Sequence, residues 1–175
     1  MSRVLGAALF VWAGLLLGVA FVATPAKFLA RSLPLAQALD VGRWTFHVLS
    51  LIEWSLVATF VAIVVVWRGV IATHWGGLLM CLLAIAAALA LQTFVVRPIL
   101  DVRVLEIMRG GRVPPSALHS VYIGLEALKL MLLLTAAALS MFAEQRNVRS
   151  NERFGRGMAP DQSKSLQERH PSAPA

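Results

Sequence analysis

Seven residues that can do chemistry lie inside or near the ends of long apolar stretches: His47, Glu53, Gln92, His119, Tyr122, Glu126 and Lys129. Ionisable groups are costly at such positions and mark ion, proton or ligand sites more often than charges elsewhere. Glu126 and Lys129 are three residues apart, a spacing that lets them pair on one helix. We therefore predict that the seven residues form a ligand-binding site or a buried polar cluster.

The two glutamates lie at matched depth. Glu53 follows Trp44 by nine residues, and Glu126 follows Ala117 by nine residues. At 1.5 Å per residue, each carboxylate lies about 13 Å along its helix. The sequence thus predicts polar residues in one half of the bilayer and an apolar second half.

Three interpretations of the charged residues stay open. Glu126 and Lys129, with or without Glu53, can form a structural ion pair that fixes how the helices meet. The same residues can bind a substrate or ion, or transfer protons. His47 and His119 can ligate haem if they face each other, although histidines near the end of a span more often make interfacial hydrogen bonds.

No sequence motif for catalysis is present. CxxC, HExxH, a Ser–His–Asp order and a glycine-rich phosphate loop are all missing from the sequence. Cys81 stands alone in an apolar stretch, where an inert buried thiol is the usual role. We predict no catalytic residue, no metal site and no cofactor, and we lean against an enzyme.

The composition is that of a membrane protein. Of the 175 residues, 58% are hydrophobic and only 14% charged, and the mean hydropathy is +0.74. Soluble domains are less apolar and more charged. The net charge of +7 reflects scarce acidic residues, and the basic residues flank apolar stretches. The expected partner is therefore the lipid bilayer, and we expect no nucleic-acid partner.

Four apolar stretches are long enough to cross a bilayer. We predict an all-α integral membrane four-helix bundle in residues 1–143, with spans at about 4–23, 44–67, 74–96 and 117–142, followed by a disordered polar tail over 144–175. The second helix is expected to start early, with Ser32 as its N-cap and Pro34 in its first turn. Residues 27–43 and 98–109 are expected to be helical extensions or short interfacial helices. We recognise no internal repeat.

Gly14 and Gly18 form a GxxxG pair in the first span. Small residues at this spacing let helices approach closely in lipid. Packing within the chain is the favoured interpretation, and a homo-oligomer formed through these glycines is the alternative.

Three short motifs resemble small four-helix membrane proteins related to eukaryotic transmembrane protein 205, whose bacterial members form a domain of unknown function. The motifs are Gly18, Phe21, Pro25 and Phe28; Arg97, Pro98, Asp101 and Arg103; and Leu118, His119, Tyr122, Glu126 and Lys129. The resemblance covers roughly residues 5 to 140. It implies a four-helix membrane protein, and it carries no activity or catalytic residue to this chain.

We predict a multi-pass membrane protein that binds, or helps to move, a small polar or ionic ligand through a polar half-cavity. A haem- or redox-associated membrane enzyme and a structural or assembly subunit are the alternatives. The bacterial inner membrane is the expected location. Both termini are expected to be cytoplasmic, because Arg146, Arg149, Arg153 and Arg156 follow the last span.

Overall fold

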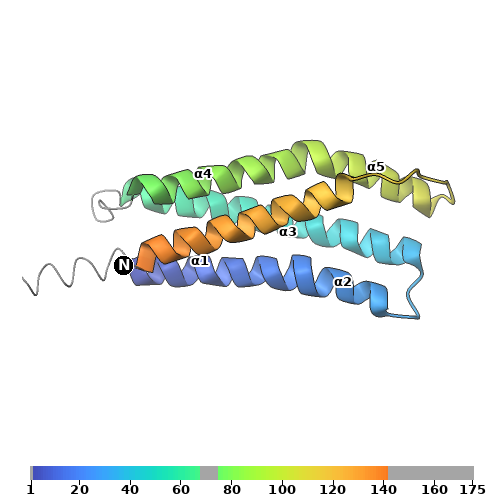
Figure 1. Ribbon diagram of the computed structural model, residues 1–175, viewed down its shortest axis with the longest axis horizontal. Helices are drawn as coiled ribbons and strands as arrows, with labels where there is room; N and C mark the ends of the chain where they lie inside the picture. The colour runs from blue at the N-terminus through green and yellow to red at the C-terminus, as the bar shows by residue number, and fades with distance from the viewer. Residues whose placement is uncertain (1, 68–74, 142–175) are drawn as a thin grey trace, which may run out of the picture.

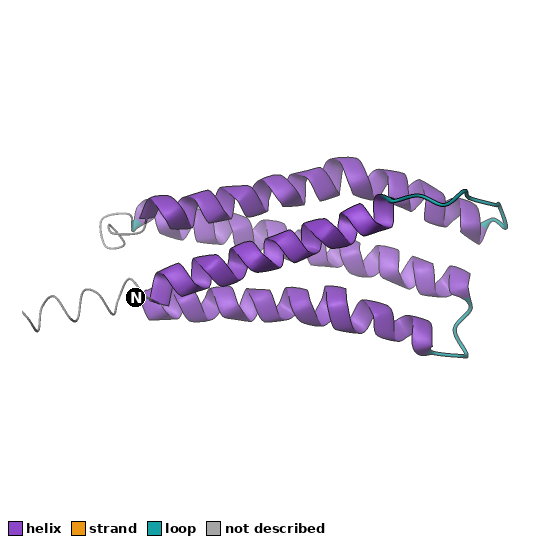
Figure 2. Cartoon of the chain, viewed as in Figure 1, coloured by secondary structure: helices purple, strands orange, loops and turns teal. Residues whose placement is uncertain are grey.

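Four long helices run side by side and alternate in direction along the chain (Figure 1). The computed structural model describes residues 2–67 and 75–141, so the expected tail disorder lies outside the described residues. The four helices, Arg3–Leu29, Leu35–Val66, Trp75–Met108 and Leu118–Met141, are long and apolar enough to cross a membrane. No strand occurs in the described residues (Figure 2). The predicted all-α membrane bundle is confirmed.

The first three helices extend beyond their predicted spans at one end of the bundle. The first comprises α1 (Ser2–Leu16), η1 (Leu17–Ala23), α2 (Thr24–Ala26) and η2 (Lys27–Leu29). The second is α3 (Leu35–Val66), and the third comprises α4 (Trp75–Leu91), η3 (Gln92–Val96) and α5 (Arg97–Met108). Of the two alternatives for the long connections, helical extension is therefore correct for most of residues 27–43 and for 98–108.

The predicted start of the second helix is wrong by two residues. Pro34, not Ser32, is the N-cap of α3, and its carbonyl accepts the Ala38 N–H at 3.0 Å. Proline fits this position because the N-cap needs only a carbonyl, and its backbone here is extended (φ −59°, ψ 145°).

The first and third helices contain the same backbone distortion. A π-helical segment precedes Pro25 in one helix and Pro98 in the other. A proline ring has no N–H and clashes with the carbonyl four residues before it, so the preceding turn widens. In both helices the N–H just before the proline donates to a carbonyl five residues back, from Thr24 to Val19 and from Arg97 to Gln92.

This correspondence belongs to a repeat that we did not recognise in the sequence. Pro98 follows Pro25 by 73 residues, and Glu126 follows Glu53 by the same interval. The sequence Phe-Val-x-x-Pro stands at residues 21–25 and again at 94–98. The first and second helices form one hairpin, and the third and fourth helices form its repeat. The expectation of no internal repeat was wrong.

Burial follows the same 73-residue offset. Eight pairs of buried side chains match across the two hairpins: Leu5 and Leu78, Leu9 and Leu82, Trp12 and Ile85, Leu16 and Leu89, Leu49 and Tyr122, Glu53 and Glu126, Phe60 and Leu133, and Val64 and Ala137. Parallel repeats in membrane proteins are related by an axis along the membrane normal. The matched burial indicates that the hairpins pack around such an axis, with corresponding side chains turned towards it.

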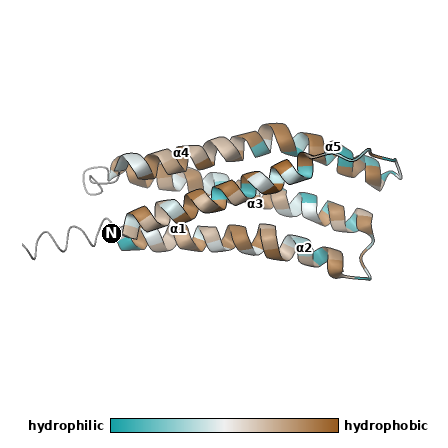
Figure 3. Cartoon of the chain, in the orientation of Figure 1, coloured by the Kyte–Doolittle hydropathy of each residue, from teal (hydrophilic) through white to brown (hydrophobic). Residues whose placement is uncertain are grey.

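One half of the bundle is apolar and tightly filled. Trp12 stacks on Phe60 with ring centroids 5.7 Å apart, among buried leucines from the first and third helices. Hydrophilic residues gather at the other end, around α2, α5 and the start of α3 (Figure 3). This asymmetry agrees with the depth estimated from the sequence.

The glycine that allows close helix packing is Gly6, not Gly14 or Gly18. A Cβ atom on Gly6 would lie 3.0 Å from Met141 Cγ and 3.3 Å from the Ala137 carbonyl oxygen, so the first and last helices approach closely there. A Cβ on Gly14 or Gly18 would meet nothing within 4 Å, and both residues are exposed. The favoured prediction, packing of Gly14 and Gly18 within the chain, was wrong.

Candidate functional site

Two buried carboxylates flank one buried ammonium at the border between the polar and apolar halves. Lys129 Nζ lies 2.8 and 2.7 Å from the two carboxylate oxygens of Glu53 and donates hydrogen bonds to both. It also lies 3.1 Å from Glu126 Oε2. Each of the three side chains is at most 2% exposed. The predicted pairing of Glu126 with Lys129 is confirmed, and Glu53 is the more tightly held partner.

Gln92 extends this cluster from the third helix. Its Nε2 donates to Glu126 Oε1 at 3.0 Å and to the Tyr122 carbonyl oxygen at 3.3 Å, while its own Oε1 is buried and has no hydrogen-bond partner among the described residues. The π-helical segment begins at Gln92, so the distortion before Pro98 places this residue in the core. We call Glu53, Gln92, Glu126 and Lys129 the buried cluster.

Two adjoining pockets with shared walls lie between the polar end of the bundle and the buried cluster. The outer part has a volume of about 90 Å³ and is lined by residues that include Lys27, Arg97 and His119. The inner part, of about 170 Å³, reaches Glu126. Both parts share the walls formed by Thr24, Phe28, Phe46, His119 and Tyr122. We call the two parts together the axial cavity.

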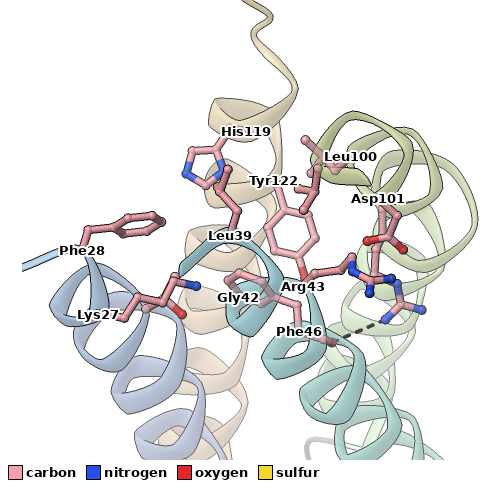
Figure 4. A pocket seen from close by; sticks show the side chains of 13 residues that line it. Lys27, Phe28, Leu39, Gly42, Arg43, Phe46, Leu100, Asp101, His119 and Tyr122 are labelled. Atoms are coloured by element: carbon pink, nitrogen blue, oxygen red, sulfur yellow. Dashed lines mark hydrogen bonds between the residues drawn. The ribbon is translucent and has the colours of Figure 1, made fainter. Parts of the chain in front are cut away.

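The axial cavity lies between the two hairpins. Its lining includes pairs related by the 73-residue offset: Thr24 and Arg97, Lys27 and Leu100, Phe28 and Asp101, and Phe46 and His119. Figure 4 shows side chains from the first helix, α3, α5 and the last helix converging on this space. The repeat therefore positions the cavity, and different side chains at matched positions give it its chemistry.

Two of the charged residues that line the axial cavity, Arg43 and Asp101, have a partner of their own. Arg43 pairs with Asp40 at 2.8 Å, and Asp101 lies 3.3 Å from His47 Nε2. Lys27 and Arg97 form no ion pair within residues 2–67 and 75–141. Lys27 lies over the Phe28 ring, and Arg97 donates to the Phe46 carbonyl oxygen at 3.4 Å.

Gly42 makes room for the Lys27 ammonium. A Cβ atom at Gly42 would overlap Lys27 Nζ, and Figure 4 shows Lys27 extending towards this glycine. Glycine is therefore required on α3 for Lys27 to occupy its place at the cavity wall.

The structure separates the seven predicted site residues into two groups. Glu53, Gln92, Tyr122, Glu126 and Lys129 are brought together and buried. His47 lies apart from them: its Nδ1 faces the Arg43 carbonyl oxygen at 2.8 Å and its Nε2 faces Asp101. His119 is exposed at the wall of the axial cavity.

This arrangement does not favour the haem interpretation. Both ring nitrogens of His47 already contact protein groups, so neither is free to ligate iron.

Lys27, Arg97, Gly42 and Phe46 are site residues that the sequence interpretation left out. The paired Phe-Val-x-x-Pro motifs could have indicated part of this site. The residue just before each proline, Thr24 or Arg97, lines the cavity. No family model, curated protein or solved structure matches this chain.

Proposed function

We propose that this multi-pass membrane protein binds a small anion in the axial cavity. The observation that carries the proposal is the presence of Lys27 and Arg97 at the cavity wall without an acidic partner among the described residues. Half-buried cations are stabilised by a counter-charge, and the other charged groups nearby already have one.

The two cations differ in a way that suits an oxyanion. An arginine guanidinium presents a planar fork that matches a carboxylate or phosphate, whereas a lysine ammonium acts as a point charge. The volume of about 90 Å³ around them admits an inorganic oxyanion or a short carboxylate. The mostly apolar walls, including Leu39, Leu100 and Val104, strengthen such an interaction by excluding water.

The experiment is a thermal-unfolding titration of the purified full chain in detergent. Inorganic phosphate, sulfate, acetate and chloride would be compared at constant ionic strength. A bound anion at 100 times its Kd stabilises the folded state by about 2.7 kcal/mol. Arg97→Gln and Lys27→Gln should each lose most of that stabilisation.

Arg31→Gln is the matched control, because Arg31 is an exposed cation near the same end of the bundle that does not line the cavity. The control should keep the stabilisation. If all three variants respond to the anions like the wild type, anion binding in the axial cavity is refuted.

We also propose a bacterial inner-membrane location with both termini in the cytoplasm. The support is the set of four arginines between residues 146 and 156, next to the last span. A Ser150→Cys variant should resist an impermeant thiol reagent added to intact cells and react after lysis. Labelling of this cysteine in intact cells would show that the C-terminus is outside the cytoplasm and would contradict the proposed orientation.

A relationship to the transmembrane protein 205 family stays a proposal as well, supported by the three short motifs around Pro25, Pro98 and Glu126. It adds no activity to the anion-binding proposal.

A further inference from the structure

The buried cluster has one more carboxylate than it has cations. Glu53 and Glu126 are 1% exposed and Lys129 is fully buried, so with all three ionised the group has an excess negative charge. Glu126 is eight residues into the last helix, about 12 Å along it, where the surroundings are helices and lipid. An uncompensated charge is strongly disfavoured at such a depth.

The two carboxylates are held differently. Both oxygens of Glu53 accept hydrogen bonds from Lys129, which is the arrangement of an ionised carboxylate. Glu126 accepts one bond from Gln92 through Oε1. Its Oε2 is near the ammonium at 3.1 Å but is not aligned to accept a hydrogen bond from it.

Only one of the two carboxylates lines the axial cavity. Glu126 forms part of the inner wall, together with Thr24 and Tyr122, whereas Glu53 lines neither part of the axial cavity. The more weakly held carboxylate is thus the one that a cavity reaches.

We propose that Glu126 is an exchangeable proton-binding site that is loaded through the axial cavity. A hydronium ion in the cavity gives its proton to a Glu126 carboxylate oxygen; one O–H bond forms, one breaks, and a water molecule is left. The neutral acid then leaves Glu53 and Lys129 as a balanced ion pair. This proposal does not rest on anion binding.

A proton suits the cluster better than a metal cation. Lys129 Nζ is 3.1 Å from Glu126 Oε2, so its charge repels any second cation placed between them. Both oxygens of Glu53 are already engaged by the same ammonium. A proton adds to the carboxylate itself and needs no further oxygen ligands.

Groups from all four helices surround Glu126 and its neighbour Tyr122. Its own helix contributes Lys129, Tyr122 and His119; α3 contributes Glu53; the third helix contributes Gln92 and Arg97; and the first helix contributes the uncharged Thr24.

The test is infrared spectroscopy of the purified full chain in buffer without oxyanions. A protonated carboxylic acid has a C=O stretching band that is separate from the carboxylate bands and shifts in D₂O. The wild type should show a band for one buried acid that disappears at alkaline pH. It should be lost in Glu126→Gln and kept in Glu106→Gln, because Glu106 is an exposed carboxylate of α5.

Glu126→Asp separates a chemical loss from a folding defect, because it keeps a carboxyl group and should retain a shifted band. The proposal is overturned if the wild type lacks the band, if the band survives Glu126→Gln, or if sodium at constant pH removes it. Anion titration of the same samples measures binding near Lys27 and Arg97 and does not depend on the Glu126 band. Failure of the anion-binding proposal can therefore be told apart from failure of the proton-binding proposal.

Discussion

Lys129 Nζ donates hydrogen bonds to both carboxylate oxygens of Glu53, at 2.8 and 2.7 Å, from a position 76 residues further along the chain. This contact joins the two hairpins at the border between the apolar core and the axial cavity. The residue of the first hairpin that corresponds to Lys129 is Leu56, which is apolar. Both hairpins therefore have a glutamate at the matched position, but only the second has the lysine. The lysine is therefore the one cation that the buried cluster places against the two carboxylates.

Removing this lysine should be severely destabilising. Breaking a buried ion pair by deleting one partner costs about 3–5 kcal/mol, because the remaining charge is left without compensation. Lys129→Met should lose stability in this range in thermal unfolding in detergent. The double variant Glu53→Gln, Lys129→Met should recover more than 1 kcal/mol of that loss, and additive losses would show that the pair is not coupled.

The repeat predicts that the lysine can be moved to the other hairpin. Leu56 follows Glu53 by three residues, as Lys129 follows Glu126. Leu56→Lys should therefore restore much of the thermal stability lost in Lys129→Leu, because the moved ammonium can reach both carboxylates. Val57→Lys in the same Lys129→Leu background is the control and should not restore it, since Val57 corresponds to Leu130. Equal behaviour of the two double variants would contradict the repeat.

The features that could be predicted from the sequence are those that depend on residues close together in the chain. Apolar runs located the four spans, and helical geometry placed Glu53 and Glu126 at one depth. The i,i+3 spacing correctly predicted the contact between Glu126 and Lys129.

Contacts between helices that are far apart in the chain could not be predicted from the sequence. Which partner holds Lys129 most tightly depends on how α3 turns against the last helix, and helix spacing contains no such information. Gly6 was overlooked because it has no glycine partner at GxxxG spacing, although it is the position where two helices approach. The repeat was missed because few identities survive, and the shared signal lies in the burial pattern.

The glycines of the first helix give a direct packing test. Gly6→Leu should destabilise the bundle by about 1–3 kcal/mol, because its side chain would collide with Met141 and the Ala137 backbone. Gly14→Leu should change stability little, since nothing lies within 4 Å of its Cβ position. Thermal unfolding of both variants in detergent measures the difference. A larger loss in Gly14→Leu would show that this glycine packs against another helix.

Gly42 offers a way to displace a cation without removing it. A methyl group at Gly42 would overlap Lys27 Nζ, which must then move away from the cavity wall. Gly42→Ala should weaken binding of the stabilising oxyanion about tenfold or more while leaving the thermal stability of the anion-free protein nearly unchanged. Gly124→Ala, on the last helix with open space at its Cβ, is the matched control. Unaltered affinity in Gly42→Ala would remove Lys27 from the binding site.

The axial cavity is expected to admit water and small anions from one end only and to stop at the buried cluster. Thr24 and Ala13 test this expectation on a single helix: both are buried, but Thr24 lines the cavity and Ala13 lies in the apolar core. In a Cys81→Ser background, the decisive measurement is the rate at which a small sulfonate-bearing thiol reagent modifies Thr24→Cys and Ala13→Cys in sealed vesicles. We predict rapid modification of Thr24→Cys from one side of the membrane and none of Ala13→Cys. Equal, slow modification at both positions would contradict an open axial cavity.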